Sequence, residues 1–208
     1  MFEERLPRVA LDPESPLAGF AEAAETWLEI GFGGGEHLAA CIVAHPGIRF
    51  IGCEPFETGV AKLLAEVPED ALDRLRVLMD DARLMLDKLP DASIDRVFLL
   101  FPDPWPKTRH HKRRFVTPEN LAEIARVLKD GGRFRYVSDD IGYVRWTLAR
   151  MPACPDLRWT ARRPDDWRVR PDDWVETRYE QKALAAGRSC TYLDFVRRRR
   201  DDADQKLE

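Results

Sequence analysis

Short apolar segments recur along this chain and alternate with longer segments of mixed polarity, a pattern typical of alternating strands and helices. Five apolar segments have the length of buried strands, at residues 26–30, 48–53, 75–79, 94–101 and 133–138. Helices are expected between them, over residues 36–44, 58–66, 118–130 and 141–151. Strands that alternate with helices of about ten residues build a parallel sheet with helices on both faces. The pattern therefore predicts an α/β fold with a doubly wound, mostly parallel sheet.

The first part of the chain departs from this alternation. Residues 1–25 are rich in proline and acidic residues, and they are expected to be an irregular N-terminal segment. Residues 26–200 are expected to form a single domain, followed by a C-terminal tail over residues 201–208. A chain of 208 residues is long enough for one domain with a substantial core.

The pattern also weakens near the end of the domain. Residues 162–174 are rich in Arg, Asp, Pro and Trp and predict a loop. Residues 177–184 and 189–196 are interpreted as a closing pair of strands. Thr177 and Glu180 also match the S/T-x-x-E capping box, which would begin a helix instead. Both interpretations of this segment stay open at the level of sequence.

Composition narrows the class of protein. A hydrophobic content of 44% and a charged content of 34% are typical of a soluble globular domain. The apolar runs are too short to span a membrane, and no secretory signal is recognisable, so a cytoplasmic protein is expected. Scattered cysteines without metal-ligand spacing are expected to be buried free thiols; they are Cys41, Cys53, Cys154 and Cys190.

Charge is distributed unevenly along the chain. Residues 1–100 contain 9 Lys and Arg against 19 Asp and Glu, whereas residues 101–208 contain 24 against 18. The positive residues crowd most densely at 107–114, with the sequence KTRHHKRR. Such crowding favours local binding of a polyanion, because ordinary solvated surface charge would not explain it.

The sequence FPDPWP at residues 101–106 immediately precedes this basic run. Each proline stiffens the backbone and disfavours helix before it, so Asp103 and Trp105 are expected on a rigid loop after a buried strand. A fixed acid and an aromatic ring beside cations suit a site that grips a planar base while the cations hold phosphates. Asp103 could also be a simple turn residue, and Trp105 a packing residue.

A glycine-rich turn follows the first predicted strand. Residues 31–35 read G-x-G-x-G, and Glu36 stands where a dinucleotide fingerprint would have its last glycine. A carboxylate there would repel a pyrophosphate, so a nucleoside without phosphates fits better, and S-adenosylmethionine is the obvious candidate. Glu54 ends the next strand, where it could bind ribose hydroxyls, and Glu29 could meet the cationic end of that cofactor. A simple packing turn is the alternative.

Acidic residues follow four of the predicted strands, namely Glu54, Asp81, Asp103 and Asp139. The carboxyl ends of parallel strands meet at one edge of the sheet, where ligands bind in such folds. These acids are therefore expected to converge on one site. Taken singly, Glu54 could be a charge at a helix N-terminus, and Asp81 could be a helix cap.

Six blocks of this sequence occur in the order in which one known family carries them, across about residues 27–197. The blocks are EIGFGGG (29–35), GCE (52–54), DDA (80–82), FPDPWPK with its basic tail (101–114), SD (138–139) and TRYE (177–180). By these motifs the chain resembles the tRNA (guanine-N7)-methyltransferases of the TrmB type. Such proteins often carry a basic segment before the first strand, where this chain is short and mostly acidic.

The resemblance implies a class I S-adenosylmethionine-dependent methyltransferase fold, Rossmann-like, with an antiparallel C-terminal strand. It implies methyl transfer from S-adenosylmethionine to N7 of a guanine in the variable loop of tRNA, with Asp103 as the catalytic residue and no metal. The implied cofactor-binding residues are Glu29, Gly31, Gly33, Gly35, Glu54, Asp81 and Asp103. The implied guanine-binding residues are Lys107, Asp139, Thr177, Arg178, Tyr179 and Glu180. The implied RNA-binding residues are Arg109, His110, His111, Lys112, Arg113 and Arg114.

Two other functions compete with this one. A nicotinamide-dependent oxidoreductase is disfavoured by the incomplete glycine fingerprint, and a non-catalytic RNA-binding protein would use the basic run without the cofactor turn. The sequence leaves open whether the protein is a monomer or a homodimer and which tRNAs it would modify. It also leaves open whether Asp103 would act by its charge or by orienting the base.

Overall fold

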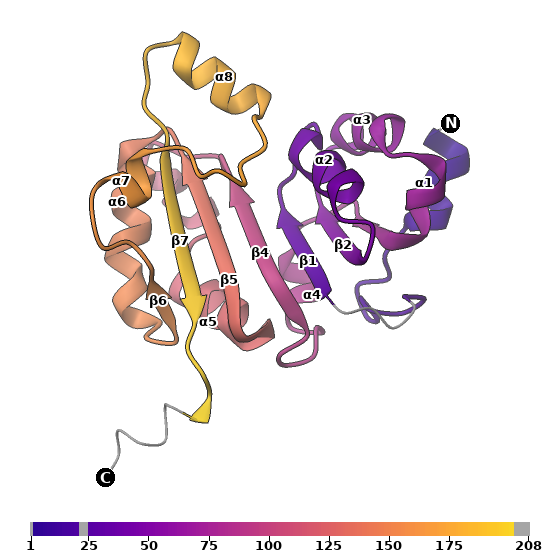
Figure 1. Ribbon diagram of the computed structural model, residues 1–208, viewed down its shortest axis with the longest axis horizontal. Helices are drawn as coiled ribbons and strands as arrows, with labels where there is room; N and C mark the ends of the chain where they lie inside the picture. Colours follow the sequence, from indigo (N-terminus) through magenta and orange to yellow (C-terminus); the bar gives the residue numbers. More distant parts are fainter. Residues whose placement is uncertain (1, 21–24, 202–208) are drawn as a thin grey trace.

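A seven-stranded sheet forms the centre of the protein (Figure 1). The computed structural model describes residues 2–20 and 25–201. The strands lie in the order β3-β2-β1-β4-β5-β7-β6. They are β1 (Glu25–Ile30), β2 (Ile48–Cys53), β3 (Leu75–Leu78), β4 (Ile94–Leu100), β5 (Leu128–Ser138), β6 (Leu157–Trp159) and β7 (Thr191–Arg197). Strands β1 to β5 pair in parallel, and β7 pairs antiparallel with β5 and β6, which confirms the predicted topology.

Helices cover both faces of this sheet. Leu28 of β1 belongs to the apolar core that includes Leu121 and Tyr143, whereas its neighbour Trp27 belongs to the core that includes Leu63. Burial on both faces explains why the strands are continuous apolar runs in the sequence. The helices are α1 (Phe2–Val9), α2 (Glu36–Ala44), α3 (Glu57–Glu66), α4 (Arg83–Leu86), α5 (Pro118–Val127), α6 (Ile141–Arg150), α7 (Asp165–Arg168) and α8 (Arg178–Ala185), with 3-10 helices η1 (Glu69–Arg74), η2 (Thr108–Arg113) and η3 (Met151–Ala153).

The expectation of an irregular segment over residues 1–25 is wrong for α1. Arg5 of this helix donates a hydrogen bond to the carbonyl of Val67 across 2.9 Å, just after α3 ends. Val9 is fully buried in the core. The helix is therefore stabilised by docking against α3, a tertiary contact that local composition does not reveal. Residues 21–24 of the predicted segment lie outside the described residues.

The interpretation of residues 177–184 as a strand is also wrong, because they form α8. The Thr177 hydroxyl accepts a hydrogen bond from the Glu180 N–H across 3.2 Å and caps the helix. The helical alternative is thus the one that the structure adopts, with only the Thr177 half of the capping box formed. Strand β7 pairs with β5 and β6 instead, and the predicted loop at 162–174 contains the single turn α7. Of the predicted tail, residues 202–208 lie outside the described residues.

The boundary between α5 and β5 differs from the sequence prediction. Helix α5 ends at Val127 rather than near residue 130, and β5 begins at once because Leu128 pairs with Ile94 of β4. The register then shifts before Arg96, and Gly131 takes a φ of +79°, which glycine adopts without strain. A glycine pair that reads as a helix stop therefore lies inside a strand.

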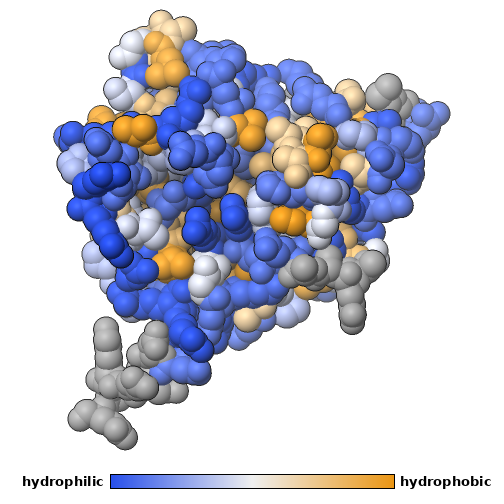
Figure 2. All heavy atoms as spheres, viewed as in Figure 1, coloured by the Kyte–Doolittle hydropathy of each residue, from blue (hydrophilic) through white to orange (hydrophobic). Residues whose placement is uncertain are grey.

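The parallel strands bring their carboxyl ends to one edge of the sheet, and α8 lies above that edge (Figure 1). Figure 2 shows that the face toward the viewer is mainly hydrophilic, with small apolar areas over α8 and over α2 and α3. No helix within residues 2–20 and 25–201 combines the length and the apolar character needed to cross a membrane. All four cysteines are free and buried, as predicted.

Candidate functional site

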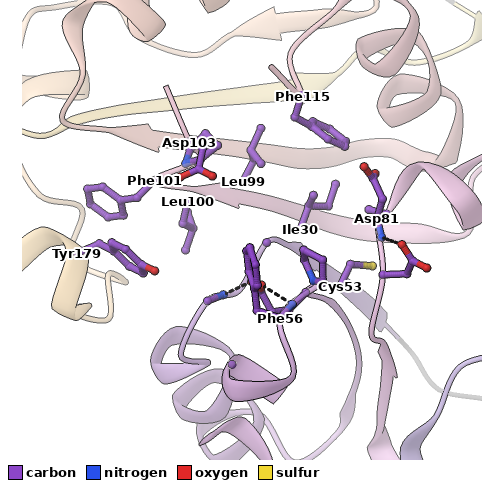
Figure 3. A pocket seen from close by; sticks show the side chains of 18 of the residues that line it. Ile30, Cys53, Phe56, Asp81, Leu99, Leu100, Phe101, Asp103, Phe115 and Tyr179 are labelled. Carbon is purple, nitrogen blue, oxygen red and sulfur yellow. Dashed lines mark hydrogen bonds between the residues drawn. The ribbon is translucent and has the colours of Figure 1, made fainter. Parts of the chain in front are cut away.

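A cavity of about 350 Å³ opens at the carboxyl edge of the sheet (Figure 3). In Figure 3, Tyr179 and Phe101 lie at one end, Cys53 and Asp81 at the other, and Asp103 and Phe115 above. Strands β1, β2 and β4 each deliver their carboxyl-terminal residues to its wall, and Asp80 and Asp81 reach it from the loop after β3. Three of the four acids predicted to converge there do so; they are Glu54, Asp81 and Asp103.

The glycine turn forms the floor of this cavity. Gly31 has a φ of +70° and Gly33 a φ of +60°, and both line the cavity. A Cβ atom added to Gly31 would meet nothing within 4 Å, so the turn is open on the cavity side. Gly35 differs from Gly31 because it is needed for packing: an added Cβ would lie 2.7 Å from the Cβ of Leu63 in α3. Gly35 therefore lets α2 and α3 pack closely, and it does not line the cavity.

Glu54 is held in a fixed position beside that turn. Its carboxylate accepts hydrogen bonds from the N–H groups of Gly33, across 2.8 Å, and Phe56, across 3.0 Å. Burial raises the pKa of the Glu54 carboxyl above its ordinary value, although these two N–H donors oppose the shift. Each carboxylate oxygen keeps further acceptor capacity, which suits a ligand with hydroxyl groups.

Asp81 lies on the far wall and is paired with Arg83. Its Oδ1 accepts hydrogen bonds from the N–H and from Nε of Arg83, across 3.0 and 2.9 Å. Hydrogen bonding to Arg83 lowers the pKa of the Asp81 carboxyl, against the opposing effect of partial burial. The wall between these acids is apolar and includes Ile30, Leu99 and Phe115.

Asp103 lies on a loop whose backbone is strained on both sides. Phe101 and Trp105 take φ values of +49° and +44°, in the left-handed region that side chains other than glycine rarely adopt. Such strain persists only where neighbouring contacts fix the backbone, and it gathers at functional sites. The rigid loop predicted from the prolines is therefore present, with the Asp103 side chain exposed toward the cavity.

A second cavity, of about 420 Å³, adjoins the first on the other side of this loop. Asp139 lines it and accepts a hydrogen bond from Arg188 Nε across 2.6 Å. Asp139 is thus the predicted acid that lies apart from the glycine turn. The wall common to both cavities consists of Phe101, Pro102, Asp103 and Tyr179.

Two predicted site residues are already engaged inside the protein. Glu29 is buried and its Oε2 lies 2.7 Å from Nδ1 of His37. Glu180 is fully buried and accepts hydrogen bonds from Trp174 Nε1, across 2.6 Å, from Arg170 Nε, across 3.0 Å, and from the Tyr192 hydroxyl. Glu180 is therefore not available to a base in this conformation.

Of the remaining predicted guanine-binding residues, only Arg178 and Tyr179 line these cavities. Tyr179 lines both, Arg178 lines only the first, and the Thr177 hydroxyl is used as the cap of α8. Lys107 is exposed just before η2 and lines neither cavity. The TRYE block thus begins helix α8 through Thr177 and supplies the side chains of Arg178 and Tyr179 to the site.

The basic run forms η2, beside the loop that carries Asp103. Arg109, Lys112 and Arg113 are exposed there, and Arg113 lies over the Trp105 ring at 4.7 Å. Arg114 differs, because it is only 5% exposed and packs over the Trp146 ring. The prediction that Arg114 contacts RNA therefore conflicts with its burial.

Two predicted histidines and one residue that was not predicted also lie near the site. His110 and His111 are half-buried, with their rings against Trp105 and Trp146 respectively. Phe56, which was not predicted from the sequence, lines the first cavity and is 69% exposed. Its position two residues after Glu54 is the only sequence signal for it. In the described part of the chain, no group of three or more His, Cys, Asp or Glu could hold a metal ion.

Two solved methyltransferases share this fold. The 16S rRNA methyltransferase KamB gives a TM-score of 0.62 at 14% identity, covering 85% of this chain and 89% of that chain. A variant of the 16S rRNA (adenine(1408)-N(1))-methyltransferase of Catenulisporales acidiphilia, solved with its cosubstrate SAM, gives 0.58 at 16%, covering 91% and 93%. The chain therefore has the class I methyltransferase fold, with its cavity at the carboxyl edge of the sheet.

The sequence places the chain more narrowly. Residues 23–193 match the model of the family described as "Putative methyltransferase" (Methyltransf_4). The tRNA (guanine-N(7)-)-methyltransferase of Rhodospirillum rubrum is 50% identical over 213 residues, covering 96% of this chain and 82% of that protein. The protein of the same name from Ruegeria pomeroyi is 55% identical over 173 residues, covering 83% and 73%. This chain belongs to the tRNA (guanine-N7)-methyltransferase family, and its methyl donor is S-adenosylmethionine.

The residues of the first cavity fit that cofactor. The open side of Gly31 leaves room for a ligand against the backbone. The Glu54 carboxylate is fixed and can accept ribose hydroxyls, and the apolar wall with Phe56 can receive a purine. The nucleoside predicted from the G-x-G-x-G spacing thus has a matching site.

Proposed function

We propose that this protein transfers the methyl group of S-adenosylmethionine to N7 of a guanine in the variable loop of tRNA, forming 7-methylguanosine. One observation carries the proposal: the same exposed carboxylate, Asp103, stands in the wall between the glycine-turn cavity and the adjoining cavity. A donor bound on one side and a base bound on the other would meet at this residue.

In the first cavity, Glu54 would bind the ribose hydroxyls, and Asp81 would lie at the purine end. The apolar surfaces of Phe56 and Phe115 would flank the ring. When bound, S-adenosylmethionine supplies an electrophilic methyl group on a sulfonium sulfur. Glu29 stays a candidate for the cationic end of the cofactor, although its pairing with His37 directs one oxygen elsewhere.

For this reaction the protein mainly has to align the methyl group of the donor with guanine N7. Guanine N7 already presents a lone pair and carries no proton, so no general base is needed at the attacking atom. Correct positioning of two reactants can contribute about 7–11 kcal/mol. Positive charge moves onto the purine ring during transfer, and the fixed carboxylate of Asp103 would stabilise it there. The strained backbone at Phe101 and Trp105 would hold that carboxylate in place.

The second cavity would receive the guanine, which must first leave its stack in the RNA. The Watson–Crick edge of guanine has N–H donors, and Asp139 could accept them. This requires Arg188 to share or release the Asp139 carboxylate, since the two are paired at 2.6 Å. Tyr179 reaches both cavities and would lie beside the base.

Phosphates of the tRNA would be met by the exposed cations of η2. Arg109, Lys112 and Arg113 follow directly after the Asp103 loop, so they would hold the backbone near the reacting base. With such a substrate, the protein would act in the cytoplasm.

The test is methyl transfer from labelled S-adenosylmethionine to unmodified bulk tRNA, followed by identification of the labelled nucleoside. We expect the label in 7-methylguanosine. Label in another nucleoside would overturn the proposed position. Cofactor binding without transfer would point to another substrate, and RNA binding without cofactor binding would point to the non-catalytic alternative.

A further inference from the structure

Arg178, the first residue of α8, enters the first cavity from above the glycine turn. Its side chain lines that cavity and does not line the second one. A Cβ atom added to Gly34 would lie 3.0 Å from the guanidinium carbon of Arg178. The guanidinium thus lies directly against the turn that the cofactor occupies, although the resemblance assigns this residue to the guanine.

The cofactor carries a carboxylate at its amino-acid end, and the turn has few N–H groups left to receive it. The N–H groups of Gly31 and Phe32 donate to the carbonyl of Cys53, across 2.7 and 3.3 Å. Gly33 donates to Glu54, and the Gly35 N–H donates to the carbonyl of Phe32. Four N–H groups that could cradle an anion are therefore used inside the protein.

The side chains around the cavity are a poor match for a carboxylate as well. The acids Glu54, Asp80, Asp81 and Asp103 line it and would repel a second anion. Arg83 is committed to Asp81, with its Nε 2.9 Å from Oδ1. Arg113 also lines the cavity, but its guanidinium stacks on the ring of Trp105 at 4.7 Å. An anionic group at the turn needs a cation that reaches it, and Arg178 does.

The guanidinium of Arg178 is held in place but is not saturated. Its Nε lies 3.2 Å from Oε1 of Glu36, the first residue of α2. This contact has the distance of an ion pair without the alignment of a hydrogen bond, and within the described residues the buried Nε has no hydrogen-bond partner. The charge of Arg178 is also felt at Glu54, where it lowers the carboxyl pKa against the larger effect of burial.

We propose that Arg178 binds the carboxylate of the methionine moiety of S-adenosylmethionine, with Glu36 orienting its guanidinium. This inference rests on the proposed function and gives one residue of the TRYE block to the cofactor rather than to the guanine. A planar guanidinium can hold a carboxylate by two parallel hydrogen bonds, which a lysine cannot reproduce. The contact would also tie α8, which closes the cavity, to the presence of the cofactor.

The test compares two ligands that differ at this end. S-adenosylhomocysteine has the carboxylate, whereas 5′-methylthioadenosine lacks the whole amino-acid end. Their dissociation constants are measured by calorimetry, without RNA, for the wild type and for Arg178→Met. We expect the variant to weaken S-adenosylhomocysteine binding by about tenfold or more and to change 5′-methylthioadenosine binding by less than about twofold. Arg178→Lys should recover part of the loss.

Two further variants make the result specific. Arg145→Met removes the same charge from an exposed position on α6 that does not line the cavity, and it should leave both constants unchanged. Lys62→Met tests the lysine of the cavity wall, and a selective loss there with none at Arg178 would overturn the inference. Equal loss of both ligands in Arg178→Met, or no loss, would overturn it too. Failure of the wild type to bind S-adenosylhomocysteine would instead overturn the proposed function itself.

Discussion

Arg114 donates a hydrogen bond from its Nε to the backbone carbonyl of Pro104 across 2.7 Å. Its guanidinium also packs over the rings of Tyr143 and Trp146, at 5.0 and 4.6 Å from their centres. The contact fastens the residue after Asp103 to helix α6. The basic run therefore contains one structural cation behind a surface of exposed ones.

Substitution of two neighbouring arginines should separate these roles. Arg113→Ala removes an exposed cation, so RNA affinity should fall and the slope of its logarithm against salt should decrease by about 1. Arg114→Ala should leave that slope unchanged while lowering the free energy of unfolding by about 1–3 kcal/mol, because it removes a buried charged donor. Filter binding over a salt series and urea denaturation measure the two effects. A changed slope in the Arg114 variant would contradict the structural role.

Asp103→Asn should lower the rate of methyl transfer by about 100-fold or more, since it removes the charge while keeping the side-chain shape. The fold should persist, because Asp103 is exposed and its loop is held by Arg114 and the prolines. Single-turnover kinetics with saturating cofactor measures the step directly. Binding of S-adenosylhomocysteine serves as the control for an intact cavity. A turnover equal to that of the wild type would remove Asp103 from the mechanism.

Glu180→Gln should lower the free energy of unfolding by about 1–3 kcal/mol, because Glu180 is a fully buried acceptor of three side-chain hydrogen bonds. Glu176→Gln is the matched control, since Glu176 contacts the same Arg170, across 3.1 Å, but is exposed. That variant should change stability by less than about 0.5 kcal/mol. If Glu180→Gln altered only the KM for tRNA and not stability, Glu180 would contact the guanine directly rather than support the fold.

Gly59→Ala should distort the cofactor turn from behind. An added Cβ would lie 2.2 Å from the carbonyl oxygen of Gly33 and 2.9 Å from Cγ of Glu54. We expect a loss of about 1–3 kcal/mol in stability and weaker binding of S-adenosylhomocysteine, although alanine favours helix at this position in α3. Gly47→Ala, whose added Cβ would meet nothing within 4 Å, should be nearly neutral. If Gly59→Ala and Gly47→Ala changed stability and S-adenosylhomocysteine binding equally, the glycine turn would tolerate a Cβ atom at residue 59.

The buried pair of His37 and Glu29 should make stability depend on pH. Burial opposes a charged imidazole, but Glu29 and Cys41 favour it more strongly and raise the pKa of His37 to about 10. A raised pKa adds stability that is complete below the ordinary value of 6.5 and disappears as pH rises through about 10. The difference in unfolding free energy between the wild type and His37→Gln should therefore shrink from pH 7 to pH 10. A difference that stays constant over this range would mean that His37 is neutral.

Local sequence patterns were sufficient for the parts of the site that local structure builds. The apolar run that forms β4 and the prolines around Asp103 specify strand and loop without help from distant residues. The positions of Glu54 and Asp81 follow from the rule that parallel strands end at one edge. These elements were predicted to within one or two residues.

The errors arose where a distant partner decides the outcome. Glu180 looks like a free carboxylate in sequence, and only the folded chain brings Trp174 and Tyr192 to it. Helix α1 is too short to be stable alone and forms because Arg5 and Val9 dock on the domain. Arg114 cannot be distinguished from its basic neighbours until the ring of Trp146 is placed beneath it.

The wall shared by the two cavities would couple the binding free energies of the two proposed ligands. Asp103 and Tyr179 face both sides, so a ligand that reorganises either residue changes the binding free energy of the other ligand. Such coupling is reciprocal: the factor by which bound tRNA changes the affinity for the cofactor equals the factor by which the cofactor changes the affinity for tRNA. The Asp103 loop and the start of α8 would thus together determine how strongly donor and acceptor affect each other's binding before any bond is broken.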